Sequence, residues 1–150
     1  MRLRGLIGMK NFTIACAESC TGGLLMSRLT DFSGASAHFK GGIVAYSNEI
    51  KNKILNVKNE TLEHFGAVSS QTALEMAANV RNFFSATIGL STTGVAGSEK
   101  IENKPVGLVY AAIVSENFSE VKEFHFSGSR LEIKSQAAEA TVKLLKKYTI

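Results

Sequence analysis

The chain changes character within residues 12–23, where Phe12-Thr13-Ile14-Ala15-Cys16-Ala17 gives way to Glu18-Ser19-Cys20-Thr21-Gly22-Gly23. The apolar half predicts a buried strand over residues 12–17, and the segment that follows predicts a helix over residues 23–32. Small hydroxyl and glycine residues therefore lie between a strand and a helix. Unpaired N–H groups and the helix dipole favour negative charge at a helix start. We expect a nucleophile and a turn that stabilises an anion here.

Strand and helix patterns alternate through the rest of the chain. Further strands are expected over residues 41–46, 87–93, 106–114 and 121–126, and further helices over residues 47–55, 59–64, 69–84 and 131–148. Early alternation followed by a late hairpin predicts an α/β fold, a three-layer α/β/α sandwich with a mixed, partly parallel sheet. Ligands of such sheets bind outside the strand ends. We expect three loops to converge on one crevice, namely Ser19 to Gly23, Ser47 to Lys51 and Thr93 to Gly97.

Length and composition predict one domain over residues 1–150, and they indicate which kinds of molecule the protein binds. The net charge of +4 is compatible with an anionic substrate, but the chain has no dense block of Lys and Arg, so we expect no nucleic-acid partner. No apolar stretch reaches the length of a membrane span. Cys16, Cys20 and three scattered histidines match no metal-site spacing, so we expect no metal and a reduced, cytoplasmic location.

A base for the serine must come from outside the histidines, because no convincing Ser-His-Asp set is present. Lys51 lies near the start of an expected helix, whose positive dipole end disfavours the ammonium form. A neutral amine near pH 7 requires the pKa to fall by roughly 3 units from its ordinary value, which burial and nearby positive charge would have to supply. The alternative is a solvated helix lysine, like Lys53.

Two further segments could bind an anion. The backbone N–H groups of Gly94-Val95-Ala96-Gly97 could approach a phosphate or carboxylate, although the same residues could simply form a tight turn. Arg130 begins the last expected helix and could bind an anion through two hydrogen bonds. Its alternative is an exposed arginine in a first helical turn.

Six short motifs occur in the order that one family shows. They are Ala17-Glu18-Ser19-Cys20-Thr21-Gly22-Gly23, Tyr46-Ser47-Asn48-Glu49 with Lys51, Gly66-Ala67-Val68-Ser69, Thr93-Gly94-Val95-Ala96-Gly97, Lys104-Pro105-Val106-Gly107 and Phe126-Ser127-Gly128-Ser129-Arg130. From about residue 12 to its end, the chain resembles the CinA C-terminal domain, also called the PncC family of nicotinamide mononucleotide amidohydrolases.

The resemblance implies an enzyme that hydrolyses nicotinamide mononucleotide, a phosphorylated pyridine nucleotide, to nicotinic acid mononucleotide and ammonia without a cofactor. It implies a serine nucleophile with a lysine base, at Ser19 and Lys51. The other positions expected to contact substrate are Thr21, Gly22, Gly23, Tyr46, Asn48, Thr93, Gly94, Ala96, Gly97 and Arg130. The N–H groups of the Cys20 to Gly23 turn would stabilise the oxyanion, and Arg130 with the second glycine loop would hold the phosphate.

The chain departs from the family pattern in three places, one of which is Ser129, where the family often has an acidic residue before the arginine. The segment before residue 12 is short and contains Gly5 and Gly8, so the family's first helix is expected to be short or absent. Apolar surface exposed by its loss would favour a homo-oligomer. The glycine loop continues as residues 98–103 instead of proline and further glycines. The alternatives are a non-catalytic nucleotide-binding or interaction module, an amidase acting on another carboxamide, and Cys20 as nucleophile.

Overall fold

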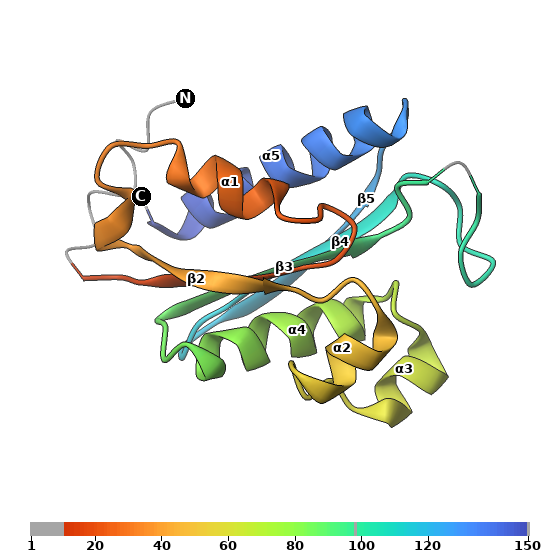
Figure 1. Ribbon diagram of the computed structural model, residues 1–150, viewed down its shortest axis with the longest axis horizontal. Helices are drawn as coiled ribbons and strands as arrows, with labels where there is room; N and C mark the ends of the chain where they lie inside the picture. The colour runs from red at the N-terminus through yellow and green to blue at the C-terminus, as the bar shows by residue number, and fades with distance from the viewer. Residues whose placement is uncertain (1–10, 98, 150) are drawn as a thin grey trace.

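The computed structural model describes residues 11–97 and 99–149, arranged as a sheet between two helical layers (Figure 1). The first-helix expectation for the segment before residue 12 falls almost wholly outside these residues. The elements are β1 (Ile14–Glu18), α1 (Leu24–Thr30), η2 (Ala35–Ala37), β2 (Phe39–Val44), α2 (Asn48–Lys53), α3 (Asn59–Phe65), α4 (Ser70–Phe83), β3 (Ile88–Gly94), β4 (Leu108–Val114), β5 (Ser119–His125) and α5 (Arg130–Thr149).

The sheet has five strands in the order β2-β1-β3-β4-β5. β1 pairs parallel with β2 and β3, whereas β4 is antiparallel to both β3 and β5. The carboxyl ends of β1, β2, β3 and β5 therefore lie at the same edge of the sheet. The predicted mixed sheet is confirmed, and the turn after β1, the start of α2, the loop after β3 and the start of α5 all lie at this edge.

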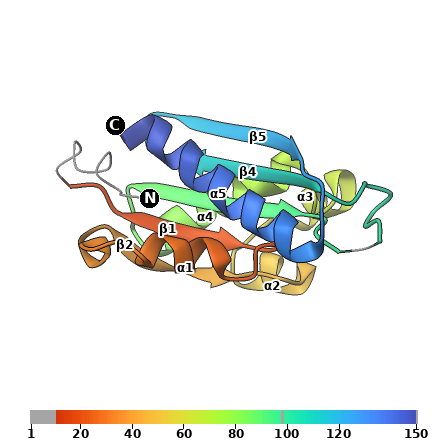
Figure 2. The same cartoon turned by 90° about the horizontal axis from the view of Figure 1, so that it is seen from above.

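Helices cover both faces of the sheet. α1 and α5 lie on one face and α4 on the other, with α2 and α3 beside α4 (Figures 1 and 2). This arrangement is the expected three-layer sandwich. In the described ranges, no helix has both the length and the apolar character needed to cross a membrane.

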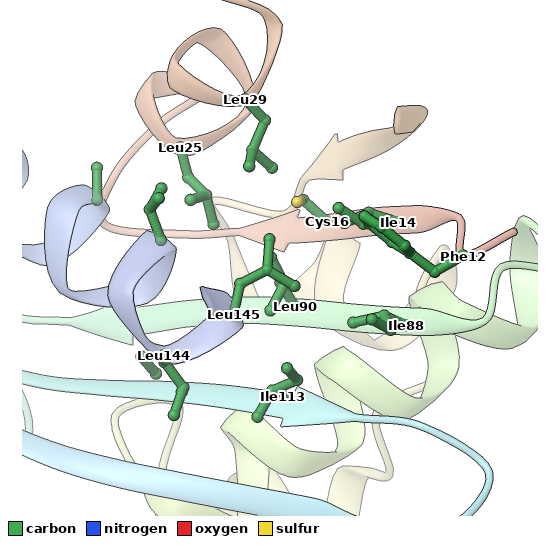
Figure 3. Close-up of a cluster of buried hydrophobic side chains, with 13 residues drawn as sticks. Phe12, Ile14, Cys16, Leu25, Leu29, Ile88, Leu90, Ile113, Leu144 and Leu145 are labelled. Atoms are coloured by element: carbon green, nitrogen blue, oxygen red, sulfur yellow. The ribbon is translucent and has the colours of Figure 1, made fainter. Parts of the chain in front are cut away.

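The side chains of β1 alternate between the two helical layers, as the period of two in a strand requires. Ile14 and Cys16 belong to the core cluster beneath α1 and α5, together with Leu25 and Leu145 (Figure 3). The alternating alanines, at positions 15 and 17, belong to the cluster that contains Met76 of α4. Burial of one leucine side chain contributes about 1.5–3 kcal/mol to folding, so both faces anchor β1 firmly.

Strand boundaries differ from the sequence expectation by up to two residues. The strand expected over residues 41–46 is Phe39–Val44, because Gly41 and Gly42 pair with β1 instead of leading into the strand. The strand expected from residue 106 begins at Leu108, since the preceding residues form a turn in which Leu108 N–H donates to the Pro105 carbonyl oxygen. Neither shift changes which loops meet at the sheet edge.

Candidate active site

Ser19 and Lys51 lie in direct contact beyond the end of β1. Lys51 Nζ donates a hydrogen bond of 3.0 Å to Ser19 Oγ and a longer one of 3.4 Å to the Tyr46 carbonyl oxygen. Ser19 is 8 % exposed and Lys51 is 2 % exposed, so little bulk water reaches the pair. The distance between the serine oxygen and the lysine nitrogen is within the range expected for a nucleophile and its base.

Local backbone structure positions both side chains. The Ser19 N–H donates to the Thr92 carbonyl oxygen at 2.9 Å, which extends the β1–β3 pairing by one residue. On the other side, Ser47 caps α2, because its Oγ accepts a hydrogen bond from the Ile50 N–H at 3.2 Å. Lys51 follows one helical turn after this cap, and its N–H donates to the Ser47 carbonyl oxygen at 3.0 Å.

The environment of Lys51 favours the neutral amine. Burial lowers the pKa of Lys51, because the ammonium form loses its hydration, and nearby Cys20 and Glu102 oppose this effect. The sequence interpretation also invoked the positive end of the helix. Lys51 is instead the fourth of six residues in α2, within its last turn, and burial is the main cause of the lowered pKa.

Cys20 is adjacent to Ser19 in sequence but packs on the opposite face of the sheet. Its side chain joins the apolar cluster of Ala96, Val109, Ile133 and Ala137, two of which belong to α5. Burial raises the pKa of the Cys20 thiol to about 12. A thiol that remains protonated near neutral pH is a weak nucleophile, so this environment favours Ser19 over Cys20.

Glu18 is the site residue to which the sequence interpretation gave no role. Its side chain is fully buried. Oε1 accepts hydrogen bonds from Thr21 Oγ1 at 2.5 Å, Gly23 N–H at 3.2 Å and Leu25 N–H at 2.9 Å, while Oε2 accepts one from Met26 N–H at 2.9 Å. Glu18 therefore caps α1 from within the preceding strand. In the sequence, the signal that could have indicated this cap is a glutamate at the end of an apolar strand, shortly before a turn with two glycines.

This cap corrects the expectation that the start of α1 is open to an anion. The Gly23 N–H is used by Glu18, and the Gly22 N–H donates to the Ser19 carbonyl oxygen at 3.0 Å. The Thr21 hydroxyl is bonded to Glu18 and Thr92. The N–H groups of residues 20 and 21 interact with the Cys20 sulfur, and this interaction lowers the pKa of the thiol. An oxyanion at Ser19 would have to compete with the Cys20 sulfur for these two N–H groups.

Replacing Glu18 with alanine is expected to destabilise the protein by about 3–5 kcal/mol, because four donors lose their acceptor in a buried setting. The free energy of unfolding in urea measures this change. Glu49→Ala is the matched control, since Glu49 is 66 % exposed and pairs only with Lys53, and its effect should stay within about 0.5 kcal/mol. Equal effects of the two substitutions would contradict the capping role.

The loop after β3 contributes mainly backbone to the site. Thr93 Oγ1 donates to the Ala67 carbonyl oxygen at 2.7 Å, so its hydroxyl fixes the turn before α4. Gly94 is the last residue of β3, and the Val95 N–H donates to the Leu108 carbonyl oxygen at 2.9 Å. Ala96 packs with Cys20 in the apolar cluster already described. The structure thus brings this loop beside the β1 turn, as expected.

Three predicted substrate contacts lie at the rim of the site. Tyr46 is 63 % exposed, and Asn48 is exposed at the first position of α2. Arg130 is the first residue of α5 and is also exposed. A Cβ atom built on Gly97 would lie 2.6 Å from Arg130 Nη2, so the guanidinium rests against the glycine loop.

The loop that departs from the family pattern, together with Lys104 after it, is hydrogen-bonded to the turn that connects α3 and α4. Glu102 Oε2 accepts from Ala67 N–H at 3.0 Å and Oε1 from Val68 N–H at 3.1 Å. Lys104 Nζ donates to the Phe65 carbonyl oxygen at 2.8 Å and also to that of Val68. The sequence offered no local signal for these contacts, which join residues more than 30 positions apart. Ala67 is therefore held by two contacts, because its N–H donates to Glu102 and its carbonyl oxygen accepts from Thr93.

No ion-binding cluster accompanies this arrangement in the part of the chain that the structure describes, where no three His, Cys, Asp or Glu side chains gather as metal ligands. The groups at the site are thus a serine hydroxyl, a lysine amine, backbone N–H donors and an arginine. This set can perform acyl transfer on a substrate that carries an anionic group.

Comparisons with known proteins match almost the whole chain. The family model described as the CinA C-terminal domain matches residues 2–149. A CinA-like protein of Syntrophomonas wolfei is 48 % identical over 136 residues, which cover 90 % of this chain and 33 % of that protein. The chain spans about a third of the length of the curated relatives it matches.

Solved structures agree with this match. The competence damage-inducible protein A (ComA) from Klebsiella pneumoniae superimposes with a TM-score of 0.92 at 31 % identity, covering 97 % of this chain and 91 % of that one. The competence/damage inducible protein CihA from Agrobacterium tumefaciens gives a TM-score of 0.86 at 37 % identity, covering 93 % and 84 %. The chain therefore belongs to the CinA C-terminal domain family.

Proposed function

We propose that this chain is an amidohydrolase that converts nicotinamide mononucleotide to nicotinic acid mononucleotide and ammonia. The observation that supports this most strongly is the 3.0 Å contact between Lys51 Nζ and Ser19 Oγ in a buried pair. A lysine whose pKa is lowered by burial can accept a proton from a serine hydroxyl. The family resemblance supplies the substrate, and the geometry supports the reaction type.

The proposed reaction has two halves that share the same base. Ser19 Oγ attacks the carboxamide carbon while neutral Lys51 takes the hydroxyl proton, and the N–H groups of residues 20 and 21 stabilise the oxyanion. One such donor is typically worth about 3 kcal/mol in the transition state. Lys51 then protonates the amine, ammonia leaves, and an ester to Ser19 remains. Water attacks this ester with Lys51 again as base, which releases the carboxylic acid and restores the serine.

The rim residues are assigned to the rest of the nucleotide. Arg130 donates two hydrogen bonds to the phosphate, an arrangement that suits the planar guanidinium. Tyr46 and Asn48 flank the opposite side of the site, at the start of α2, where they contact the pyridine ring and ribose. Their exposure supports this assignment, because a ligand has access to both side chains.

A substrate panel tests the proposal against its alternatives. Nicotinamide mononucleotide, nicotinamide riboside and free nicotinamide are each incubated with the protein, and ammonia is measured together with ligand-dependent thermal stabilisation. The proposal expects fast ammonia release from the mononucleotide. Stabilisation by the mononucleotide without any ammonia would instead indicate a nucleotide-binding module. Neither stabilisation nor ammonia would indicate an amidase for another carboxamide.

A further inference from the structure

The first turns of α5 direct two cationic side chains at the two glycine turns of the site. Arg130 Nη2 lies 2.6 Å from the position of a Cβ atom built on Gly97, and Lys134 Nζ lies 3.7 Å from one built on Gly22. Residues four apart share one face of a helix. One cation therefore lies against the loop after β3 and the other against the turn that carries Ser19, and Figure 2 shows the start of α5 beside this turn.

Two other lysines of the same helix have carboxylate partners. Lys143 pairs with Glu139, and Lys147 pairs with Glu120 of β5. Within residues 11–97 and 99–149, no carboxylate oxygen lies within 4.0 Å of the Arg130 or Lys134 side-chain nitrogens.

Glu132, between the two cations in sequence, is held elsewhere. Its carboxylate accepts a hydrogen bond of 2.6 Å from the Ser129 N–H, at the start of the helix. Two like charges four residues apart on a helix repel each other. A dianion placed between Arg130 and Lys134 would turn this repulsion into two attractive contacts.

We propose that Lys134 is a specificity-determining residue that binds the terminal phosphate monoester of the substrate together with Arg130. A phosphate monoester carries nearly two negative charges at neutral pH, which matches two cations. Arg130 contributes a planar pair of donors and Lys134 a flexible point charge. Because Lys134 adjoins Gly22, it links phosphate binding to the turn that holds Ser19. This inference rests on the proposed function and extends it to the choice between nucleotide and nucleoside.

Binding to the Ser19→Ala protein separates phosphate recognition from turnover. Calorimetry compares nicotinamide mononucleotide with nicotinamide riboside, with and without Lys134→Met. The added substitution is expected to weaken mononucleotide binding about tenfold and to leave riboside binding unchanged, because it removes one charge-assisted contact to the phosphate. Lys134→Arg should restore most of the affinity. Lys143→Met is the matched control on the same helix and should change neither ligand's affinity.

The outcomes distinguish this inference from the proposed function. Equal weakening of both ligands, or no weakening of either, would overturn the assignment of Lys134, whether or not the wild-type protein releases ammonia. Selective weakening of mononucleotide binding would support it even if no ammonia were formed, in which case only the proposed hydrolysis would fail.

Discussion

Ser19→Ala is expected to slow ammonia release from nicotinamide mononucleotide by at least about 10⁴-fold, because loss of a nucleophile removes the whole covalent route. The fold should persist, since the substitution removes one oxygen atom and Lys51 Nζ keeps its contact with the Tyr46 carbonyl oxygen. Turnover under saturating substrate measures the first effect, and unfolding in urea measures the second. The variant should still bind nicotinamide mononucleotide, because the phosphate contacts are untouched.

Two neighbouring substitutions control this experiment. Ser27→Ala lies on the exposed face of α1 and should leave turnover unchanged. Cys20→Ala should keep most of the activity, because the thiol packs under α5 and faces away from the reacting pair. Ammonia release that survives in Ser19→Ala but disappears in Cys20→Ala would show that the nucleophile is Cys20.

Lys51→Met is expected to lower turnover by about 10²–10⁴-fold, the usual contribution of a general base. Lys51→Arg should not restore it, because a guanidinium cannot accept the proton. In the wild-type protein kcat/KM should rise with pH as Lys51 loses its proton, and should level off below the ordinary range for lysine because burial lowers the pKa. This rise should be missing from the residual activity of Lys51→Met.

The same substitution should not reduce stability at neutral pH. The pKa of Lys51 is lower in the folded state than its ordinary value of 10.5. At a pH between the folded-state pKa and the ordinary pKa, the unfolded chain therefore binds more protons than the folded protein. Stability conferred by this group is therefore lost as pH falls through that window and gained as pH rises. Lys51→Met removes the cost of burying the amine, so its melting temperature at pH 7 should equal or exceed that of the wild type.

Lys53→Met is the matched control for both effects. Lys53 lies two residues away on the same helix, but its side chain is 66 % exposed and pairs with Glu49. Its substitution should change neither the pH profile nor the melting temperature appreciably. If Lys51→Met and Lys53→Met gave the same modest loss of activity, Lys51 would not be the base.

The alternation of strands and helices predicted that the loops carrying Ser19 and Lys51 meet at the sheet edge, because parallel strands bring their carboxyl ends together. The pairing of the two side chains came from the family resemblance. The alternation of side chains along β1 also explains why Ser19 and Cys20 lie on different faces of the sheet, which the sequence interpretation did not use. Cys16 faces α1 and α5, and so does Cys20, whereas Ala17 and Ser19 fall on the other face. Extending the alternation past the end of β1 would have assigned the lysine contact to the serine and the apolar contact to the cysteine.

Other features of the site depend on contacts that no local pattern reveals. The side chain of Glu18 reaches the start of α1 only because the intervening turn folds back on β1. Glu102 meets the corner before α4 across 34 or 35 positions of sequence. The lowered pKa of Lys51 depends on burial, and burial depends on tertiary packing around a side chain that reads as polar in the sequence.

The ammonia released by the wild-type protein from nicotinamide mononucleotide, measured together with the nicotinic acid mononucleotide formed, tests the central claim most directly. We predict that the two products appear in a one-to-one ratio, at a rate proportional to protein concentration. A folded protein that binds the mononucleotide but forms neither product would contradict the assignment of this chain as an amidohydrolase.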